Sequence, residues 1–196
     1  MTAGLTPSGV EIVCGAAKIP HVSLVQDRES AVSCCTATGW TILGDDTENL
    51  AASTSHILGT QSLEFDKTDG TDNTIFAGAY NTLACAKDMS RFCAHDELET
   101  AFYISDKTNV EYVFIRLGTD VSNYTEWRIL AAAITQAVWD VHDIALSTCE
   151  LVAVGAGWNP SAVQYVSLGV AFDLESRALV DIKFDHLYLG TTQLTA

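Results

Sequence analysis

A long series of short, β-prone runs separated by turn residues dominates this sequence and limits the folds open to it. From about Thr36 onward, about nine runs are rich in Val, Ile, Phe, Tyr and Thr, with Gly, Asp or Asn between them. The side chains of 111–117 alternate, with Tyr112, Phe114 and Arg116 on one face and aliphatic residues on the other. The runs are 39–43, 54–65, 74–80, 99–105, 110–117, 124–130, 138–146, 163–172 and 179–189. Such strands are typical of two antiparallel sheets that bury their inner faces against each other.

The rest of the pattern agrees with an all-β fold. Strands do not alternate with helices, which argues against a parallel α/β fold. We expect the alanine-rich run 129–138 to form a hairpin region or a short helical turn. We expect a bulge near Asp185, where the alternation of the last strand slips. The sequence therefore predicts an all-β, two-sheet antiparallel β-sandwich of jelly-roll type over residues 36–196, with an extended N-terminal arm over residues 1–35.

The predicted arm differs from the domain that follows it. It holds two short apolar pieces, 10–13 and 22–25, on either side of Pro20. Neither piece is long enough to make a sheet alone. The arm therefore either adds strands to the sandwich or contacts a neighbouring subunit.

The composition is strongly acidic, with 25 Asp and Glu against 10 Lys and Arg and a formal net charge of −15. Such a surface repels phosphate backbones and anionic membranes, so we expect neither nucleic acid nor a membrane as a partner. Residues 1–7 lack the basic start and apolar stretch of a signal peptide, which predicts synthesis in the cytoplasm without a leader. The 6 Cys show no CxxC spacing, and we interpret them as small buried residues in a reducing compartment.

No recognised catalytic motif is present. The sequence has no G-x-S-x-G elbow, and its His residues lie in no catalytic pattern. The neighbouring His and acidic residues at 95–97 and 140–143 are interpreted as ordinary polar loop residues. We predict that the protein is not an enzyme and has no catalytic and no cofactor-binding residues.

The acidic turn 66–72 is the candidate position for a bound cation. Asp66, Asp69 and Asp72 are spaced acidic residues, and Asp185 on the closing strand offers another carboxylate. The spacing does not match an EF-hand loop, which also needs a later Glu. A plain acidic turn is the main interpretation, and a structural calcium is the alternative; no metal-ligating residue is assigned.

Exposed aromatic side chains are the candidates for contact with a glycan or a protein partner, because sugar rings stack on them. Most Trp side chains in a sandwich fill the core. Trp158, in a glycine-bounded loop, and Tyr124 are the two candidates that we single out. The aromatic residues considered are Trp40, Trp127, Trp139, Trp158 and Tyr124.

Arg116 is a charged residue inside an otherwise apolar strand. It pairs with Asp120, contacts the start of the following turn, or faces solvent. The stretch 118–124 is interpreted as a connection whose Asp and Asn supply turn hydrogen bonds.

Three segments of the sequence resemble a jelly-roll family that includes carbohydrate-binding-module-like domains and tailed-phage virion proteins. They are G-x-x-SL-x-F at 59–65, RLG-x-D-x-x-NY-x-x-W at 116–127, and the closing strand 180–189 with an internal Asp. The resemblance covers about residues 36–190. It implies a two-sheet antiparallel sandwich, and for a chain with an N-terminal arm it implies a capsid decoration (cement) protein.

Two hypotheses of function follow. The leading one is a bacteriophage virion structural protein, a capsid decoration protein that forms a homotrimer and stabilises the shell by binding neighbouring copies of the major capsid protein. The alternative is a tail-associated or free carbohydrate-binding jelly-roll module. The first predicts an arm buried at a protein interface, and the second predicts exposed aromatic side chains with affinity for a polysaccharide.

Overall fold

The computed structural model describes residues 28–34, 36–70, 75–92, 96–147 and 150–190. Within them the chain forms 12 β-strands and two single-turn 3₁₀ helices. The first six strands are β1 (Arg28–Ser33), β2 (Trp40–Leu43), β3 (Thr47–Ser53), β4 (Ser62–Lys67), β5 (Phe76–Lys87) and β6 (Glu97–Tyr103). The remaining elements are β7 (Val110–Asp120), β8 (Asn123–Leu130), η1 (Ala131–Ala133), β9 (Trp139–Ala145), β10 (Glu150–Val154), η2 (Pro160–Ala162), β11 (Val163–Phe172) and β12 (Leu179–Gly190).

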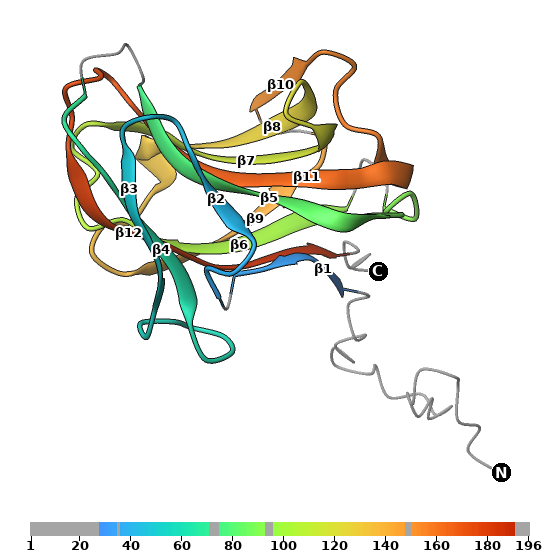
Figure 1. Ribbon diagram of the computed structural model, residues 1–196, viewed down its shortest axis with the longest axis horizontal. Coiled ribbons are helices and arrows are strands. Elements are labelled where there is room, and N and C mark those ends of the chain that lie inside the picture. Colours follow the sequence, from blue (N-terminus) through green and yellow to red (C-terminus); the bar gives the residue numbers. More distant parts are fainter. Residues whose placement is uncertain (1–27, 35, 71–74, 93–95, 148–149, 191–196) are drawn as a thin grey trace, which may run out of the picture.

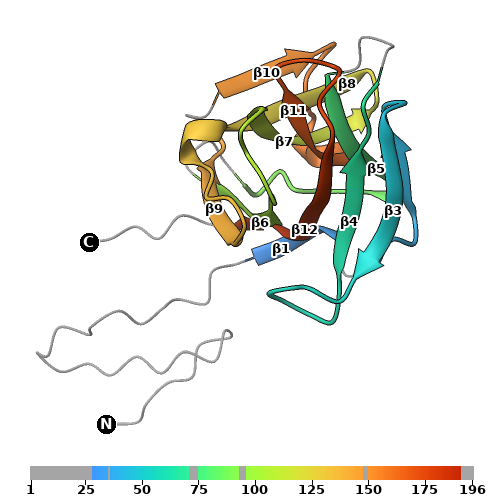
Figure 2. The ribbon, with the colours of Figure 1, turned by 90° about the vertical axis from the view of Figure 1, so that its left-hand side faces the viewer.

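The strands form two antiparallel sheets of six strands each. One sheet has the order β3-β4-β12-β6-β9, with β1 also paired to β12, and we call it the β12 sheet. The other has the order β10-β8-β7-β11-β5-β2, and we call it the β7 sheet. In Figure 1, β7, β8, β10 and β11 lie above β1, β6 and β12, so the two sheets stack as layers. Figure 2 shows the same layers after a quarter turn.

The core lies between the two sheets because alternate residues of each strand point inward. From the β7 sheet, Val113, Ile115 and Leu117 are fully buried in it, and from the β12 sheet so are Phe65 and Phe184. The rings of Phe65 and Phe184 stack with centroids 6.0 Å apart. The expected two-sheet antiparallel sandwich is therefore confirmed.

Most of the strands predicted from the sequence are present, and three strands, β1, β3 and β10, lie outside the predicted runs. The alanine-rich run contains the short turn η1, as expected, and β12 changes register between Phe184 and Leu187, at the expected bulge. The run predicted over 54–65 is a strand only from Ser62 onward. Strand β3 was not predicted, because the alanine, polar and acidic residues of 47–53 have little of the β-branched content that marks a strand.

The segment predicted to be an arm lies partly outside the described residues. Residues 1–27 are not described, so the expected contact with a neighbouring subunit stays a prediction. Its last part, β1, pairs antiparallel with β12 of the same chain, with Arg28 opposite Gly190. No helix among the described residues is long and apolar enough to cross a membrane.

Candidate functional site

The face of the β7 sheet turned away from the core carries an unusual set of rings and charges. The register of β7, β8, β11 and β5 places these side chains in adjacent rows on that one face. In one row Glu126, Arg116, Ser167 and Tyr80 follow one another across four strands. We call this surface the aromatic face; its members are Phe76, Tyr80, Tyr112, Phe114, Arg116, Tyr124, Glu126, Arg128, Tyr165 and Ser167.

Glycines create the space in which the rings of this face lie down on the sheet. A Cβ at Gly169 would lie 2.2 Å from Cζ of Phe114, and one at Gly78 would lie 3.3 Å from it. A Cβ at Gly118 would lie 2.6 Å from Cβ of Tyr124. The ring of Phe114 therefore lies over two glycines of neighbouring strands and is fully buried although it faces away from the core.

The rings contact one another across strands. Phe76 meets Phe114 edge to face with centroids 6.2 Å apart. Tyr165 lies between Tyr80, at 5.8 Å, and Tyr124, at 5.9 Å. Phe76, Tyr80, Tyr112 and Tyr124 are only half-buried, so their rings reach the surface above the buried Phe114 and Tyr165. Such contacts fix the ring positions and leave a preformed apolar surface.

Three charged side chains lie among the rings. Glu126 accepts hydrogen bonds from Nε of Arg116 (2.7 Å) and from Nε of Arg128 (2.6 Å), one at each carboxylate oxygen. The Arg116 guanidinium lies 4.1 Å from the centroid of Phe114, and that of Arg128 lies 4.2 Å from Tyr112. The side chains of Arg116 and Glu126 are 12% and 4% exposed. The cluster is thus held rigid by ion pairs and by ring contacts of the cation–π type.

Two hydroxyl groups of this face are buried and make no well-formed hydrogen bond to a described residue. They are Oη of Tyr165 and Oγ of Ser167. Burial raises the pKa of the Tyr165 phenol, and weak hydrogen-bond contacts with Ser167 and Arg116, together with the charge of Arg116, oppose this shift. Tyr165 therefore keeps its proton at neutral pH and can donate it to a hydrogen bond.

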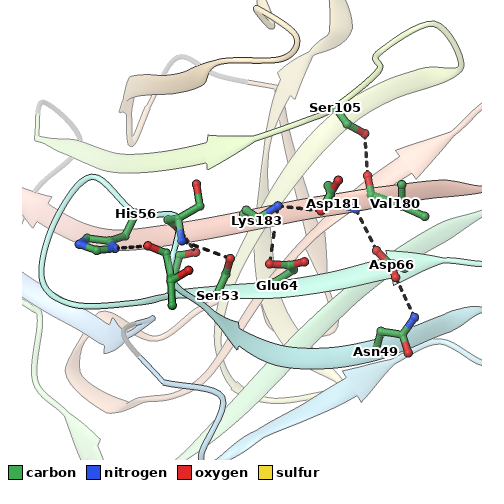
Figure 3. A network of polar contacts seen from close by, with 12 residues as sticks. Asn49, Ser53, His56, Glu64, Asp66, Ser105, Val180, Asp181 and Lys183 are labelled. Carbon is green, nitrogen blue, oxygen red and sulfur yellow. Dashed lines mark hydrogen bonds and ion pairs between the residues drawn. The ribbon is translucent and has the colours of Figure 1, made fainter.

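The outer face of the β12 sheet carries polar residues too, but they pair with one another (Figure 3). Lys183 contacts Asp181 at 2.9 Å and Glu64 at 3.6 Å. Asp66 accepts hydrogen bonds from Nδ2 of Asn49 at 2.8 Å and from the backbone N–H of Asp181 at 2.9 Å. This network ties β3, β4 and β12 together, and each of its charged side chains has a hydrogen-bond or ion-pair partner within it. The aromatic face, with its half-exposed rings, is therefore the better candidate for a ligand.

The turn predicted as a candidate cation site is held by a lysine of the chain itself. Nζ of Lys67, whose side chain is fully buried, contacts Oδ2 of Asp46 (2.9 Å) and the backbone carbonyls of Thr68 (3.0 Å) and Glu175 (2.8 Å). Among the described residues, no group of three or more His, Cys, Asp or Glu could hold a metal ion. Thr71 and Asp72 lie outside the described residues.

Asp185, the other carboxylate considered for a cation, is buried in the bulge of β12. Its Oδ2 accepts hydrogen bonds from the backbone N–H groups of Ile57 and Leu58, each at 2.5 Å. Asp185 therefore anchors the loop between β3 and β4 to the closing strand.

The two predicted contact residues lie apart, Tyr124 on β8 and Trp158 in the connection between β10 and η2. Tyr124 belongs to the aromatic face, where it lies 5.1 Å from the Arg116 guanidinium. Trp158 packs against the core, edge to face with Trp127 at 5.4 Å, and its backbone N–H donates to Oγ1 of Thr125. Of the other Trp residues considered, Trp40 is buried and Trp139 is half-buried.

Sequence reasoning placed Arg116 on the correct face but did not find its partner. Arg116 pairs with Glu126, and not with Asp120. Asp120 does supply turn hydrogen bonds as expected, to the N–H of Ser122 and Nδ2 of Asn123, although β7 continues as far as Asp120. The missing signal was the hairpin register, which sets Arg116 opposite Glu126.

Other polar residues also lie elsewhere than expected. The residues 140–143 lie on β9 and not in a loop, and the ring of His142 stacks on Phe102 at 5.2 Å. Asp96 and Glu97 lie at the start of β6, and His95 is outside the described residues. Cys34 is buried, as expected, whereas Cys85 is exposed on β5; the other four cysteines lie outside the described residues.

Comparison with known proteins identifies the class of fold. No protein-family model and no curated protein sequence matches the chain. Among solved structures, the chain is similar to the family 30 carbohydrate-binding module of a cellulosomal cellulase of Clostridium thermocellum, with a TM-score of 0.56 and 12% identity over 86% of this chain and 99% of the module. It is also similar to a family 11 carbohydrate-binding module from Clostridium thermocellum, solved with a β-1,3-1,4-mixed-linked tetrasaccharide, with a TM-score of 0.54 and 10% identity over 78% and 88% of the two chains.

An enzyme shares the fold over only part of its length. The structure of an exo-β-agarase aligns with 80% of this chain but with 24% of the enzyme, at a TM-score of 0.55 and 10% identity. Three structures that match over most of both chains are carbohydrate-binding modules, and the fold is a β-sandwich of their type. Nothing in these comparisons indicates a phage virion protein or a capsid decoration role.

Proposed function

We propose that the protein is a non-catalytic carbohydrate-binding protein and that the aromatic face is its glycan-binding surface. The observation that carries this proposal is the set of rings on one face of one sheet, turned away from the core and partly exposed. The C–H-rich faces of sugar rings stack on such side chains, and nearby polar groups bind the hydroxyls.

The fold supports the same proposal. Two of the solved structures that align with most of this chain and with most of their own length are carbohydrate-binding modules by name, and one of them was solved with a bound tetrasaccharide. At 10–12% identity this similarity concerns the fold alone, so the proposal rests on the rings and charges of this chain.

The test is binding of the purified chain to a panel of soluble polysaccharides, measured by affinity gel electrophoresis and isothermal titration calorimetry. Replacing Tyr124 or Tyr80 by Ala should weaken binding by about 1–2 kcal/mol, or roughly 5- to 30-fold, because each change removes a half-exposed ring. Tyr103→Ala is the matched control, since Tyr103 is a half-buried tyrosine on the outer face of the other sheet. Equal loss in all three variants, or no binding to any glycan, would contradict the proposal.

The virion hypothesis now ranks below glycan binding. The homotrimer, the contact with the major capsid protein and the location in the virion stay predictions. Quantitative mass spectrometry of density-purified phage particles tests them: copy numbers close to that of the major shell protein would restore this hypothesis.

A further inference from the structure

Glu126 is a nearly buried carboxylate among the rings of the aromatic face. It lies on β8 opposite Arg116 of β7, and Arg128 follows two residues later on the same face of β8. One carboxylate oxygen accepts a hydrogen bond from Nε of Arg116 at 2.7 Å, and the other accepts from Nε of Arg128 at 2.6 Å. The Glu126 side chain is 4% exposed. Its two oxygens are thus directed to the arginines, and almost none of the side chain can be reached by a glycan.

The two arginines in turn lie against rings of the aromatic face. The Arg116 guanidinium lies within reach of three ring centroids, those of Phe114 (4.1 Å), Tyr124 (5.1 Å) and Phe76 (5.5 Å). The Arg128 guanidinium lies 4.2 Å from the centroid of Tyr112. Three of these four rings are half-buried and reach the surface. They therefore rest against cations that one carboxylate holds in place.

Tyr80 is a half-buried ring of the same face that lies apart from this arrangement. Its ring packs against Tyr165 with centroids 5.8 Å apart. Within the part of the chain that the structure describes, neither Arg116 nor Arg128 is in cation–π contact with Tyr80. Tyr80 is therefore an internal reference for any effect that passes through the two arginines.

Loss of the carboxylate charge should disturb the rings through these contacts. Hydrogen bonds between charged partners are stronger than those between neutral groups, and a guanidinium is attracted to the face of a ring. Without the charge of Glu126, the two neighbouring guanidinium groups repel each other without a shared counter-charge. Arginine side chains have many rotamers, so they can then leave their positions against the rings.

We propose that Glu126 is a positioning residue for glycan binding, which holds Arg116 and Arg128 against the rings and thereby fixes the surface on which sugar rings stack. This inference rests on the proposed function of the aromatic face. Glycan affinity then depends on a side chain that does not contact the glycan.

The first test is the variant Glu126→Gln, which keeps the shape of the side chain and removes its charge. Isothermal titration calorimetry with a polysaccharide that binds wild type should show an affinity lower by about 3- to 10-fold. Glu64→Gln is the matched control, because it removes a carboxylate that lies 3.6 Å from Nζ of Lys183 on the outer face of the other sheet. This control should keep the wild-type affinity.

A double-mutant cycle separates positioning from a general loss of structure. Tyr124→Ala should weaken binding less in the Glu126→Gln background than in wild type, because the ring is no longer held there. Tyr80→Ala should weaken binding equally in both backgrounds. In the free protein, NMR of ring-labelled Tyr should show that Glu126→Gln shifts the signals of Tyr112 and Tyr124.

Arg128→Gln provides a second variant at the more exposed end of the same arrangement, where the arginine side chain is 26% exposed. It should reduce the effect of Tyr112→Ala on affinity and leave that of Tyr124→Ala unchanged, because Arg116 keeps its bond to Glu126. This variant tests the inference even if Glu126→Gln does not fold.

The outcomes separate this inference from the proposed function. If Glu126→Gln binds as wild type does, or if the effects of Tyr124→Ala and Tyr80→Ala change alike, Glu126 is not a positioning residue and the glycan-binding face stands. Lower affinity with unchanged ring signals in the free protein would overturn the inference too. If no glycan binds wild type, the proposed function fails and the inference fails with it.

Discussion

The buried lysine of β4 gives a sharp prediction about stability. Nζ of Lys67 joins three segments, because its partners lie in the β2–β3 turn (Asp46), at the end of β4 (Thr68) and in the β11–β12 connection (Glu175). Its ammonium also lies 5.7 Å from the ring centroid of Phe172. The positive charge thus occupies a set of oxygen atoms that resembles a small cation site.

The change Lys67→Met keeps most of the apolar stem and removes the charge. It leaves the Asp46 carboxylate, 8% exposed, without a counter-charge, and it leaves two carbonyls without their donor. Removing one partner of a buried ion pair costs about 3–5 kcal/mol of unfolding free energy. For a chain of 196 residues, that cost lowers the melting temperature by roughly 6–20 °C.

Differential scanning calorimetry and urea unfolding measure this loss. The double variant Asp46→Asn/Lys67→Met should lose less stability than the sum of the two single variants, because it leaves no unpaired charge. Arg177→Gln, which breaks an exposed pair, should leave the melting temperature nearly unchanged. Excess calcium chloride should not stabilise wild type, because Lys67 occupies these oxygens. A Lys67→Met variant as stable as wild type, or clear stabilisation of wild type by calcium, would refute this reasoning.

Three further changes have clear expected outcomes. Burial, and to a smaller extent the neighbouring carboxylates, raises the pKa of Glu97. The ionised form is therefore disfavoured in the folded state. As a result, the stability of the fold falls as the pH rises through that raised pKa. Glu97→Gln should therefore raise the melting temperature at neutral pH, and the gain should disappear below the unfolded pKa of about 4.3. Gly169→Ala forces a Cβ to within 2.2 Å of the Phe114 ring; unfolding in urea should show a loss of about 1–3 kcal/mol, and glycan affinity should fall with it. Trp158→Ala removes the ring packed on Trp127 and should lower stability by about 1–3 kcal/mol while calorimetry shows unchanged glycan affinity.

The fold could be predicted because strand alternation is a local property of the sequence. The run 111–117 placed Tyr112, Phe114 and Arg116 on one face, and the structure keeps them there. Strand β10 was not predicted because it is a strand of only five residues at the edge of its sheet, and β8 is its one partner among the described strands. A short strand at the edge of a sheet is less buried than a central strand, so its sequence shows a weaker hydrophobic pattern.

The candidate site could be predicted only in part, because it is made by register between distant strands. Tyr124 was recognised from the sequence as a candidate contact, whereas Tyr165 was not. Tyr165 lies about forty residues further along the chain. It comes to lie opposite Gly118 only because β11 pairs with β7 in this register. The glycines under Phe114 likewise belong to β5 and β11. Trp158 illustrates the converse, since a glycine-bounded loop position does not reveal that the ring turns toward Trp127.

Protein-observed NMR with ring-labelled Tyr and Phe, during titration with a glycan that binds, tests the central claim most directly. The account predicts saturable shifts of the ring signals of Phe76, Tyr80 and Tyr124, with the signals of Tyr103 unchanged. Saturable shifts confined to Tyr103 and its neighbours on the β12 sheet would contradict it, and so would the absence of shifts with every glycan of the panel.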